Sequence, residues 1–262
     1  MSKFDLREKK PIPIAKAHIL FDLHGVLVSK KELSKKYDQK VITFLEKQFG
    51  IPKKDASRAV EEANRKWVRF WDKAKGLPPE VIIANYEHAN EVWAQSLVKD
   101  HFQGDYRQLA EFLEYTVPSQ ICCRYPEVLA EICAFKEQAA TLHIASSAHT
   151  RHTFGILAGC HLLPYFTTIV GLENTRAVKS DILYYKKMLQ LVGAKAEDCL
   201  FIGNSTTEIS LSKRMGIRSV FITRELTKES IASSAALAEQ ADLVLPDLAN
   251  LLLHLRESHL IE

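Results

Sequence analysis

The chain has 262 residues, of which 47% are apolar and 26% are charged. This balance excludes disordered, collagen-like and low-complexity proteins, and the length suits one large domain or a core domain with an insert. The net charge of +3 is too small to indicate nucleic-acid binding, and no apolar run reaches the roughly 20 residues needed to cross a bilayer. We therefore expect a globular protein with neither a nucleic acid nor a membrane as its partner.

Residues 1–16 are basic, contain proline and lack the apolar stretch of a signal peptide. The five cysteines form an odd set without a CxxC pair. This pattern favours free thiols in a reducing compartment over disulfides or a zinc site. We therefore expect a cytoplasmic protein.

A short apolar run at 17–22 predicts a buried strand that ends in a turn at Leu23, His24 and Gly25. From about residue 29 to residue 118 the pattern is helical, because charged stretches alternate with apolar residues three and four positions apart. Breaks that contain glycine, proline or both divide this segment into about four helices. No strand is expected in it.

After Pro126 the pattern changes to short apolar runs that alternate with helical stretches. These runs predict strands at 142–145, 167–170, 200–202, 220–222 and 243–245. Strands that alternate with helices indicate a parallel sheet with helices on both faces, and the strand near residue 20 joins this sheet across the insert. The predicted fold is an α/β, doubly wound (Rossmann-like) core domain at 1–28 and 119–262, with an inserted helical cap domain at 29–118.

In a doubly wound sheet, ligands bind at the carboxyl ends of the strands. The polar residues that follow the apolar runs, and a lysine between two of the strands, are therefore the candidate site. They are Asp22, His24, Ser146, Ser147, Lys179, Asn204 and Glu208. The set contains a nucleophile, hydroxyl groups, a cation and oxygen atoms suited to a metal ion.

These segments resemble the four motifs of the haloacid dehalogenase-like (HAD) superfamily of phosphotransferases and hydrolases. The first motif, an apolar strand that ends in Asp-x-Asp-Gly, corresponds to 21–27, and the second, a strand that ends in Ser or Thr, corresponds to 142–147. The third, a lysine near a helix start, corresponds to Lys179. The fourth, Gly-Asp-x-x-x-Asp after a strand, corresponds to 203–208. The insert at 29–118 lies where the family's helical cap of the first type belongs.

The resemblance implies a phosphatase that hydrolyses a small phosphorylated metabolite through an aspartyl-phosphate intermediate. Asp22 would attack phosphorus, and His24 would serve as acid and base. Ser146, Ser147 and Lys179 would bind the phosphoryl group. Structural roles remain open for the same residues, because Asp is common in turns, Ser caps helices, and a lysine can simply be solvated.

The resemblance also implies Mg²⁺, held by Asp22, the backbone carbonyl of His24, Asn204 and Glu208. Two of these positions depart from the family pattern. His24 stands where the hydrolases have a second aspartate, and Asn204 stands where they have a metal-binding aspartate. Because Mg²⁺ is held mainly by carboxylates, the loss of one charge predicts weak binding.

These departures leave three functions open. The first is a phosphatase, fully active or attenuated. The second is a catalytically inactive binding or regulatory protein on the same scaffold. The third is a metal-independent dehalogenase-type hydrolase, although that group has Asp-x-Tyr-Gly in the first motif and this chain does not. No sequence feature indicates an oligomeric state.

Overall fold

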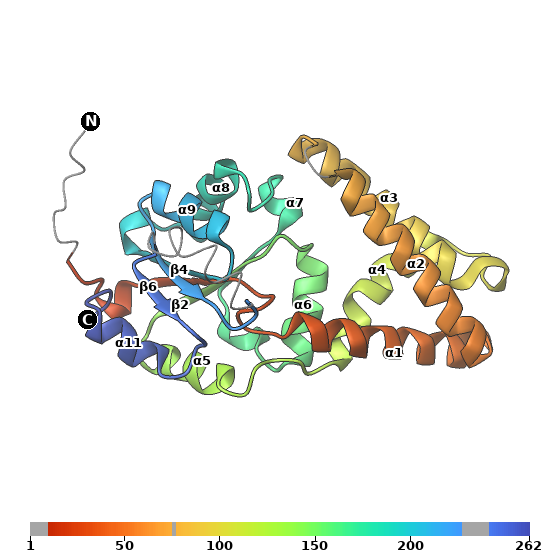
Figure 1. Cartoon of the computed structure of the whole chain (residues 1–262), viewed down its shortest axis with the longest axis horizontal. Helices are drawn as coiled ribbons and strands as arrows, with labels where there is room; N and C mark the ends of the chain where they lie inside the picture. Colours follow the sequence, from red (N-terminus) through yellow and green to blue (C-terminus); the bar gives the residue numbers. More distant parts are fainter. Residues whose placement is uncertain (1–9, 75–76, 227–240) are drawn as a thin grey trace.

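The computed structural model describes residues 10–74, 77–226 and 241–262. Within these ranges, six strands form one all-parallel sheet in the order β3-β2-β1-β4-β5-β6 (Figure 1). The strands are β1 His18–Phe21, β2 Thr141–Ala145, β3 Thr168–Val170, β4 Cys199–Gly203, β5 Arg218–Ile222 and β6 Leu243–Leu245. Each expected strand overlaps an observed one, so the α/β, doubly wound fold is confirmed.

Strand β1 lies at the centre of the sheet, between β2 and β4. Strands β2 and β3 extend the sheet on one side of it, and β4, β5 and β6 extend it on the other. In the parallel register, Phe21 at the end of β1 pairs with Ile144 and with Ile202. The residues that follow these strands therefore meet at one edge of the sheet, at its topological switch point.

Helices cover both faces of the sheet (Figure 1). They are α5 Val128–Glu137, α6 Thr150–Gly159, α7 Leu172–Thr175, α8 Ile182–Val192, α9 Thr206–Arg214 and α11 Leu251–Glu257. Leu20, Tyr184 and Phe201 are fully buried in the apolar cluster on the α8 and α9 side. On the other side, the Phe21 ring lies 6.1 Å from the ring of Phe135 on α5. Both faces of the sheet are thus buried, which explains why its strands are continuous apolar runs.

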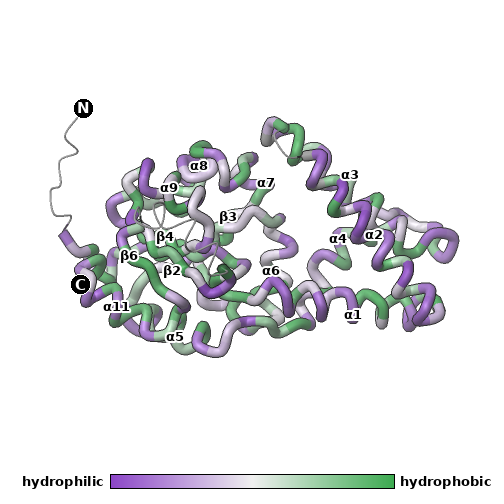
Figure 2. The backbone as a smooth tube through the Cα atoms, viewed as in Figure 1, coloured by the Kyte–Doolittle hydropathy of each residue, from purple (hydrophilic) through white to green (hydrophobic). Residues whose placement is uncertain are grey.

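Within 29–118, the described residues form four α-helices and no strand. These helices are α1 Lys30–Phe49, α2 Lys53–Ala74, α3 Pro79–Val98 and α4 Tyr106–Thr116. The side chain of Ser29 accepts a hydrogen bond from the Glu32 N–H and begins α1, and Gly50 ends it with a left-handed φ of 63°. The four helices extend away from the sheet (Figure 1), and Figure 2 shows long hydrophilic stretches along them. The division into core and cap domains stays a prediction.

Two chain segments connect the helical insert to the sheet, and they pair with each other. The Ser29 N–H donates to the Cys123 carbonyl at 2.9 Å, and the Tyr125 N–H donates to the Leu27 carbonyl at 3.1 Å. The exit from the core and the return to it therefore lie side by side. Tyr125, in the return segment, is placed next to the turn that follows β1.

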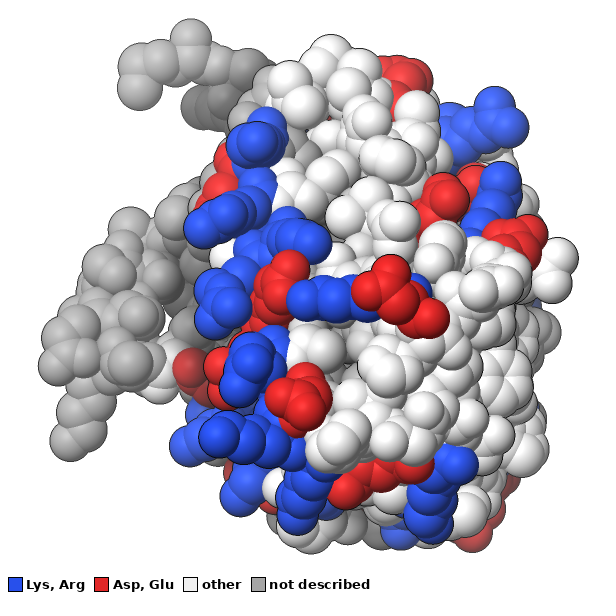
Figure 3. Space-filling model, turned by 90° about the vertical axis from the view of Figure 1, so that its right-hand side faces the viewer, with Lys and Arg blue, Asp and Glu red and all other residues white. Residues whose placement is uncertain are grey.

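The surface of the described ranges carries mixed charge. Figure 3 views the α1–α4 end, where Lys and Arg side chains gather along one edge with Asp and Glu among them. Opposite charges pair locally on these helices, as Lys36 does with Glu32 and Lys99 with Glu62, each at 3.1 Å. In the part of the chain that the structure describes, no helix combines the length and apolarity needed to cross a membrane.

Two histidines lie side by side on β1 and β2, the half-buried His18 and the buried His143. His143 is 1% exposed, its Nε2 lies 3.0 Å from Nδ1 of His18, and its own Nδ1 has no hydrogen-bond partner. Burial, together with the charges of His18 and Lys136, lowers the pKa of His143 to about 4. The folded protein therefore keeps this ring neutral at pH values where the unfolded chain binds a proton.

We expect the His143→Leu variant to be less sensitive to acid than the wild type. Since the folded pKa is depressed, the stability contributed by the neutral ring is complete above pH 6.5 and is lost as pH falls towards 4. Between pH 7 and pH 5 this loss is about 2 kcal/mol, and the leucine variant should lack it. Urea unfolding at the two pH values measures the difference, with the exposed His88→Gln as control. An unchanged pH dependence in His143→Leu would contradict the assignment.

Candidate functional site

The carboxyl ends of β1, β2 and β4 bring together side chains that are far apart in the sequence. Asp22 follows β1, and Ser146 follows β2. Asn204 directly follows β4, and Glu208 lies in the first turn of α9. Lys179 comes from the loop between α7 and α8. Asp22, Ser146 and Lys179 are buried. The structure thus gathers five of the seven predicted site residues at the switch point.

Lys179 is the centre of this arrangement. Its Nζ lies 2.6 Å from Oδ1 of Asp22 and 2.9 Å from Oε1 of Glu208. The hydroxyl of Tyr185 donates to the Lys179 carbonyl at 3.1 Å, and the ammonium lies 5.6 Å from the centre of the Phe201 ring. One cation therefore bridges a carboxylate that follows β1 and a carboxylate on α9, and it contacts residues of α8 and β4.

Burial and neighbouring charges determine the protonation of Lys179 and Glu208. Burial lowers the pKa of Lys179, but the charges of Asp22 and Glu208 outweigh burial and raise that pKa above its ordinary value. Burial raises the pKa of Glu208 to about 7, Asp22 adds to the rise, and Lys179 opposes it. Lys179 is therefore charged at neutral pH, while Glu208 changes its protonation close to neutrality.

His24 is placed two residues beyond Asp22, where helices from the insert reach the core. Burial, with the charges of Lys30 and Lys179, lowers the pKa of His24 to about 4. Its ring stacks on that of His152 in α6 with centroids 6.3 Å apart, and His152 lies 6.0 Å from the ring of Tyr37 in α1. At neutral pH, His24 is therefore a neutral imidazole that can accept a proton.

Asn204 contacts the backbone of the turn after β1. Its Nδ2 donates to the carbonyl of His24 at 3.1 Å. The turn approaches so closely because Gly25 has a φ of +81° and no side chain. A Cβ at Gly25 would lie 2.1 Å from Nδ2 of Asn204, so only glycine fits there.

The two serines after β2 have different environments. Ser146 is buried, and its hydroxyl oxygen accepts a hydrogen bond from the Ala148 N–H at 3.1 Å. Ser147 is exposed. Neither serine is the N-cap of α6, because His149 holds that position and its Nδ1 accepts from the Arg151 N–H at 3.3 Å. The alternative role expected for the serines, as helix caps, is therefore wrong.

The site offers oxygen atoms of the kind that Mg²⁺ binds. These are the carboxylates of Asp22 and Glu208, the carbonyl of His24 and the amide oxygen of Asn204. Oε2 of Glu208 is buried without a hydrogen-bond partner, as a ligand atom is before a cation arrives. The amide of Asn204 must turn over to present Oδ1, which gives up a hydrogen bond worth about 1 kcal/mol. With that rotation, the residues fit the ion.

The fit of these residues to Mg²⁺ depends on the backbone carbonyl of His24 and the side-chain amide of Asn204. Within the described ranges, no three or more His, Cys, Asp and Glu side chains are grouped so that they could hold a metal ion. Two carboxylates and two neutral oxygens make a weaker set than carboxylates alone. Weak Mg²⁺ binding therefore stays a prediction.

Sequence reasoning missed two residues beside the site, Tyr125 and Glu225. The Tyr125 hydroxyl donates to Oε1 of Glu225 at 2.5 Å. Glu225 comes soon after β5, so the rule that selected residues beyond the first, second and fourth strands would have found it there as well. Tyr125 has no comparable signal, because only the pairing of the two connecting segments brings it near.

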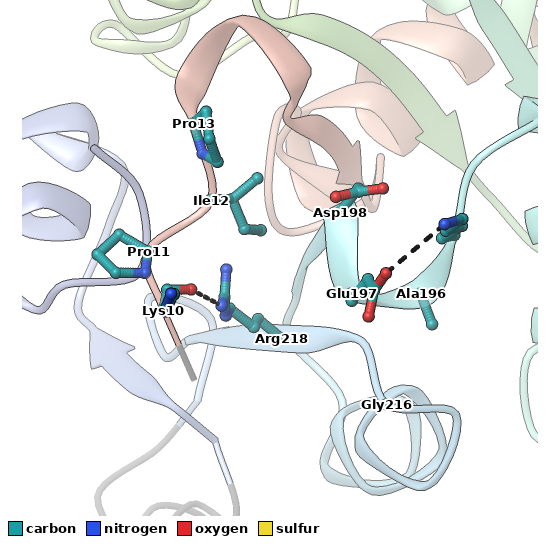
Figure 4. A pocket seen from close by; sticks show the side chains of 10 residues that line it. Lys10, Pro11, Ile12, Pro13, Ala196, Glu197, Asp198, Gly216 and Arg218 are labelled. Atoms are coloured by element: carbon teal, nitrogen blue, oxygen red, sulfur yellow. Dashed lines mark hydrogen bonds and ion pairs between the residues drawn. The ribbon is translucent and has the colours of Figure 1, made fainter. Parts of the chain in front are cut away.

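A separate cavity of about 720 Å³ lies at the opposite edge of the sheet (Figure 4). It is lined by residues that precede β1 and β4 and by Arg218, the first residue of β5. Arg218 donates to the carbonyls of Lys10 and Leu260. The cavity is thus at the amino ends of the strands and takes no part in the site described above.

Comparison with known proteins agrees with the fold and the motifs. The family model of the haloacid dehalogenase-like hydrolases matches residues 19–222. The chain therefore belongs to the haloacid dehalogenase-like hydrolase family. This confirms the resemblance inferred from the motifs.

Two curated relatives are phosphoglycolate phosphatases. The chain is 26% identical to the one from Rhodospirillum rubrum over 133 residues, which cover 50% of this chain and 55% of that enzyme. It is 25% identical to the one from Aquifex aeolicus over 175 residues, which cover 64% of this chain and 75% of that enzyme. The alignment thus spans little more than half the length of the Rhodospirillum relative.

Solved structures share the architecture. A HAD-family hydrolase from Bacillus subtilis, bound to magnesium, aligns with a TM-score of 0.57 at 18% identity, covering 91% of this chain and 98% of that one. A 2-haloacid dehalogenase from Pseudomonas syringae aligns with a TM-score of 0.61 at 16% identity, covering 92% and 98%. At such identities the likeness shows the fold alone.

We expect the Lys179→Met variant to be destabilised by about 3 kcal/mol, because it leaves two buried carboxylates facing each other without their cation. Urea unfolding at pH 7.5 measures this. Lys186→Met, in the exposed part of α8, is the matched control and should stay within about 0.5 kcal/mol of the wild type. The double variant Lys179→Met with Glu208→Gln should recover part of the loss. Equal stability of the two methionine variants would contradict the bridging role of Lys179.

Proposed function

We propose that the protein is a phosphatase that hydrolyses a small phosphorylated metabolite, with Asp22 as the nucleophile. The observation that carries this proposal is the buried Asp22 carboxylate at the switch point of the sheet, 2.6 Å from the ammonium of Lys179. A carboxylate can form a covalent phosphoryl intermediate, and a fixed cation beside it stabilises the negative charge of the transferring group. The phosphoglycolate phosphatases from Rhodospirillum rubrum and Aquifex aeolicus, both relatives of this chain, support the same class of substrate.

In the first step, an oxygen of Asp22 forms a bond to phosphorus while the bond from phosphorus to the leaving oxygen breaks. Lys179 neutralises charge on the phosphoryl oxygens, and the hydroxyl of Ser146 donates to one of them. The exposed Ser147 would contribute its backbone N–H. When bound, Mg²⁺ supplies further positive charge against the phosphoryl oxygens.

In the second step, a water molecule attacks phosphorus and releases Asp22 and inorganic phosphate. His24 takes the proton from this water through the free nitrogen of its neutral imidazole, although the pKa of about 4 makes it a weak base. The same pKa makes its protonated form scarce at neutral pH, so His24 protonates a leaving oxygen poorly in the first step. Phosphate esters with weakly basic leaving groups should therefore be turned over faster than simple alkyl phosphates.

We further propose that residues 29–118 act as a cap domain over a core domain formed by 1–28 and 119–262. His24 stacks on His152, and the ring of Tyr37 on α1 lies 6.0 Å from that of His152, which supports contact between this insert and the site.

We also propose a cytoplasmic location. The five cysteines are free thiols, which suits a reducing compartment.

One observation favours a second candidate, a binding or regulatory protein without turnover. The amide of Asn204 donates to the His24 carbonyl, so two of the residues that would hold a metal ion hydrogen-bond to each other instead. Such a protein would bind a phosphate ester through Lys179 and Ser146 and release it unchanged. A dehalogenase reaction at carbon would need neither the ion nor a phosphoenzyme.

We expect the wild-type protein to release inorganic phosphate from a panel of small phosphate esters in the presence of Mg²⁺. The Asp22→Asn variant should lose at least about a thousandfold in rate, ~4 kcal/mol of barrier, because the amide cannot form the intermediate. A colorimetric phosphate assay measures this, with Asp55→Asn on the exposed surface of α2 as control. Release of chloride from 2-chloropropionate, without release of phosphate, would replace the phosphatase with the dehalogenase. No turnover of either substrate class would favour the binding protein.

We expect the double variant His24→Asp with Asn204→Asp to hydrolyse alkyl phosphates about a hundredfold faster than the wild type, ~2.7 kcal/mol of barrier. The first change supplies a carboxylic acid to protonate the leaving oxygen, and the second restores a charged metal ligand. Steady-state kinetics with a single alkyl phosphate measures the effect. A fall in rate would show instead that His24 and Asn204 act together in a site adapted to them.

A further inference from the structure

Two cysteines from distant parts of the chain lie side by side where the insert joins the core. Cys123 belongs to the segment that returns from the insert, and Cys160 is the C-cap of α6. Their Sγ atoms are 3.9 Å apart, and both residues are buried, with exposures of 2% and 0%. Because a disulfide joins sulfur atoms about 2 Å apart, a small movement brings this pair to bonding distance.

Gly159 lets α6 approach the return segment closely enough for the two thiols to meet. A Cβ at Gly159 would lie 2.4 Å from the Pro118 carbonyl oxygen and 2.5 Å from the Ile121 carbonyl oxygen, so only glycine fits there. The thiol of Cys160 donates to the same Ile121 carbonyl at 3.8 Å. The two sulfur atoms are therefore held next to each other by tightly packed backbone.

The surroundings of Cys160 favour its thiolate. The Cys123 N–H donates to Sγ of Cys160 at 3.4 Å, and Nη1 of Arg124 donates to the Cys160 carbonyl at 2.9 Å. The hydrogen bond from the Cys123 thiol, helped by the backbone and the charge of Arg124, lowers the pKa of Cys160 to about 6 against the effect of burial. The same thiol contact, together with burial, raises the pKa of Cys123. Cys160 is therefore the more nucleophilic thiol of the pair.

The neighbouring Cys122 provides a contrast within the same segment. Burial alternates along this segment, so that Cys122 is exposed while Ile121 and Cys123 are buried. The Sγ atom of Cys122 lies 3.2 Å from Nη1 of Arg124. Cys122 is thus open to any thiol reagent, whereas the buried pair suits a small oxidant such as hydrogen peroxide.

We propose that Cys123 and Cys160 form a redox site, at which hydrogen peroxide converts two thiols into a reversible disulfide. The Cys160 thiolate attacks one peroxide oxygen, the O–O bond breaks, and the leaving hydroxide takes up the proton that Cys160 gave to solvent. The Cys123 sulfur then attacks the sulfenic acid on Cys160, and its proton joins the second departing hydroxide. Two electrons pass from the sulfur atoms to the peroxide, and two water molecules are released.

The disulfide ties the junction between the insert and the core to α6. The Cys123 carbonyl accepts from the Ser29 N–H at 2.9 Å, so Cys123 lies where the chain both leaves the core and returns to it. Helix α6 also carries His152, whose ring stacks on that of His24. Oxidation therefore restrains the connecting segments beside the candidate site, and reduction frees them. This redox chemistry does not depend on the proposed phosphatase activity.

Peptide mapping of the full chain after treatment with hydrogen peroxide tests the site. Free thiols are alkylated in denaturant before digestion with trypsin. Fragment 108–124 then contains Cys122 and Cys123. Fragment 152–176 contains Cys160. We expect oxidation to join these two fragments, and dithiothreitol to separate them again.

Single substitutions identify the two sulfur atoms in the link. The Cys122→Ser variant should form the same link as the wild type, and so should Cys199→Ser, which removes a buried thiol of β4. The Cys123→Ser variant should form no link, and its fragment 152–176 should gain oxygen, because oxidised Cys160 then lacks a partner thiol. The Cys160→Ser variant should leave Cys123 unoxidised.

We also expect oxidation to raise the melting temperature of the wild type by about 5 °C or more, because a link across 37 positions restricts the unfolded chain. The Cys123→Ser variant should show no such rise. A wild-type protein that keeps both thiols while Cys122 is oxidised would overturn the proposal, and so would a link that persists in Cys123→Ser. Linked protein with an unchanged melting temperature would contradict the restraint.

Discussion

The ion bridge from Lys179 to Asp22 and Glu208 is the interaction on which the rest of the site depends. The two carboxylates follow different strands of the sheet and are held close together in a buried setting, where like charges repel strongly. The positive charge of Lys179 offsets this repulsion. Since charges lose hydration on burial, such a bridge is a poor way to stabilise a fold, and its presence at the switch point indicates that it serves chemistry.

The remaining features adapt this bridge to a site with two unusual residues. Burial and the charges of two lysines lower the pKa of His24, so the imidazole is neutral, has a free ring nitrogen and is a weak base. The Asn204 amide donates a hydrogen bond to the His24 carbonyl and lies in the space left by the missing side chain of Gly25. Two of the residues that would hold a divalent cation therefore hydrogen-bond to each other. The site of this HAD-family hydrolase thus combines a buried ion bridge with an amide that is hydrogen-bonded to the turn after β1.

Much of the architecture could be predicted from sequence because a parallel sheet with both faces covered needs continuous apolar runs. The boundaries were less accurate where polar residues are buried. Strand β5 begins at Arg218, two residues before the expected 220–222, because the Leu260 carbonyl satisfies Arg218 and Asp242 accepts from the Ser219 N–H. Hydrogen bonds to distant segments of this kind leave no local pattern.

The candidate site, like the fold, could be predicted only in part from the sequence. Asp22 and Lys179 could be predicted because motif spacing places them at strand and helix ends. The direction of the Asn204 amide, the pairing of Tyr125 with Glu225 and the stacking of His24 on His152 depend on how distant segments pack. No periodicity or motif reports such contacts, and Ser147 shows the converse, a residue that fits a motif and lies exposed.

The covalent role of Asp22 is the central claim, and mapping the phosphoryl group tests it most directly. The protein is mixed with a phosphate ester, quenched in acid during turnover, digested and analysed by mass spectrometry. We expect a phosphoryl group on the peptide that contains Asp22, and none on the same peptide from Asp22→Asn. Turnover without any phosphorylated peptide, or a phosphoryl group on a peptide that lacks Asp22, would contradict the account.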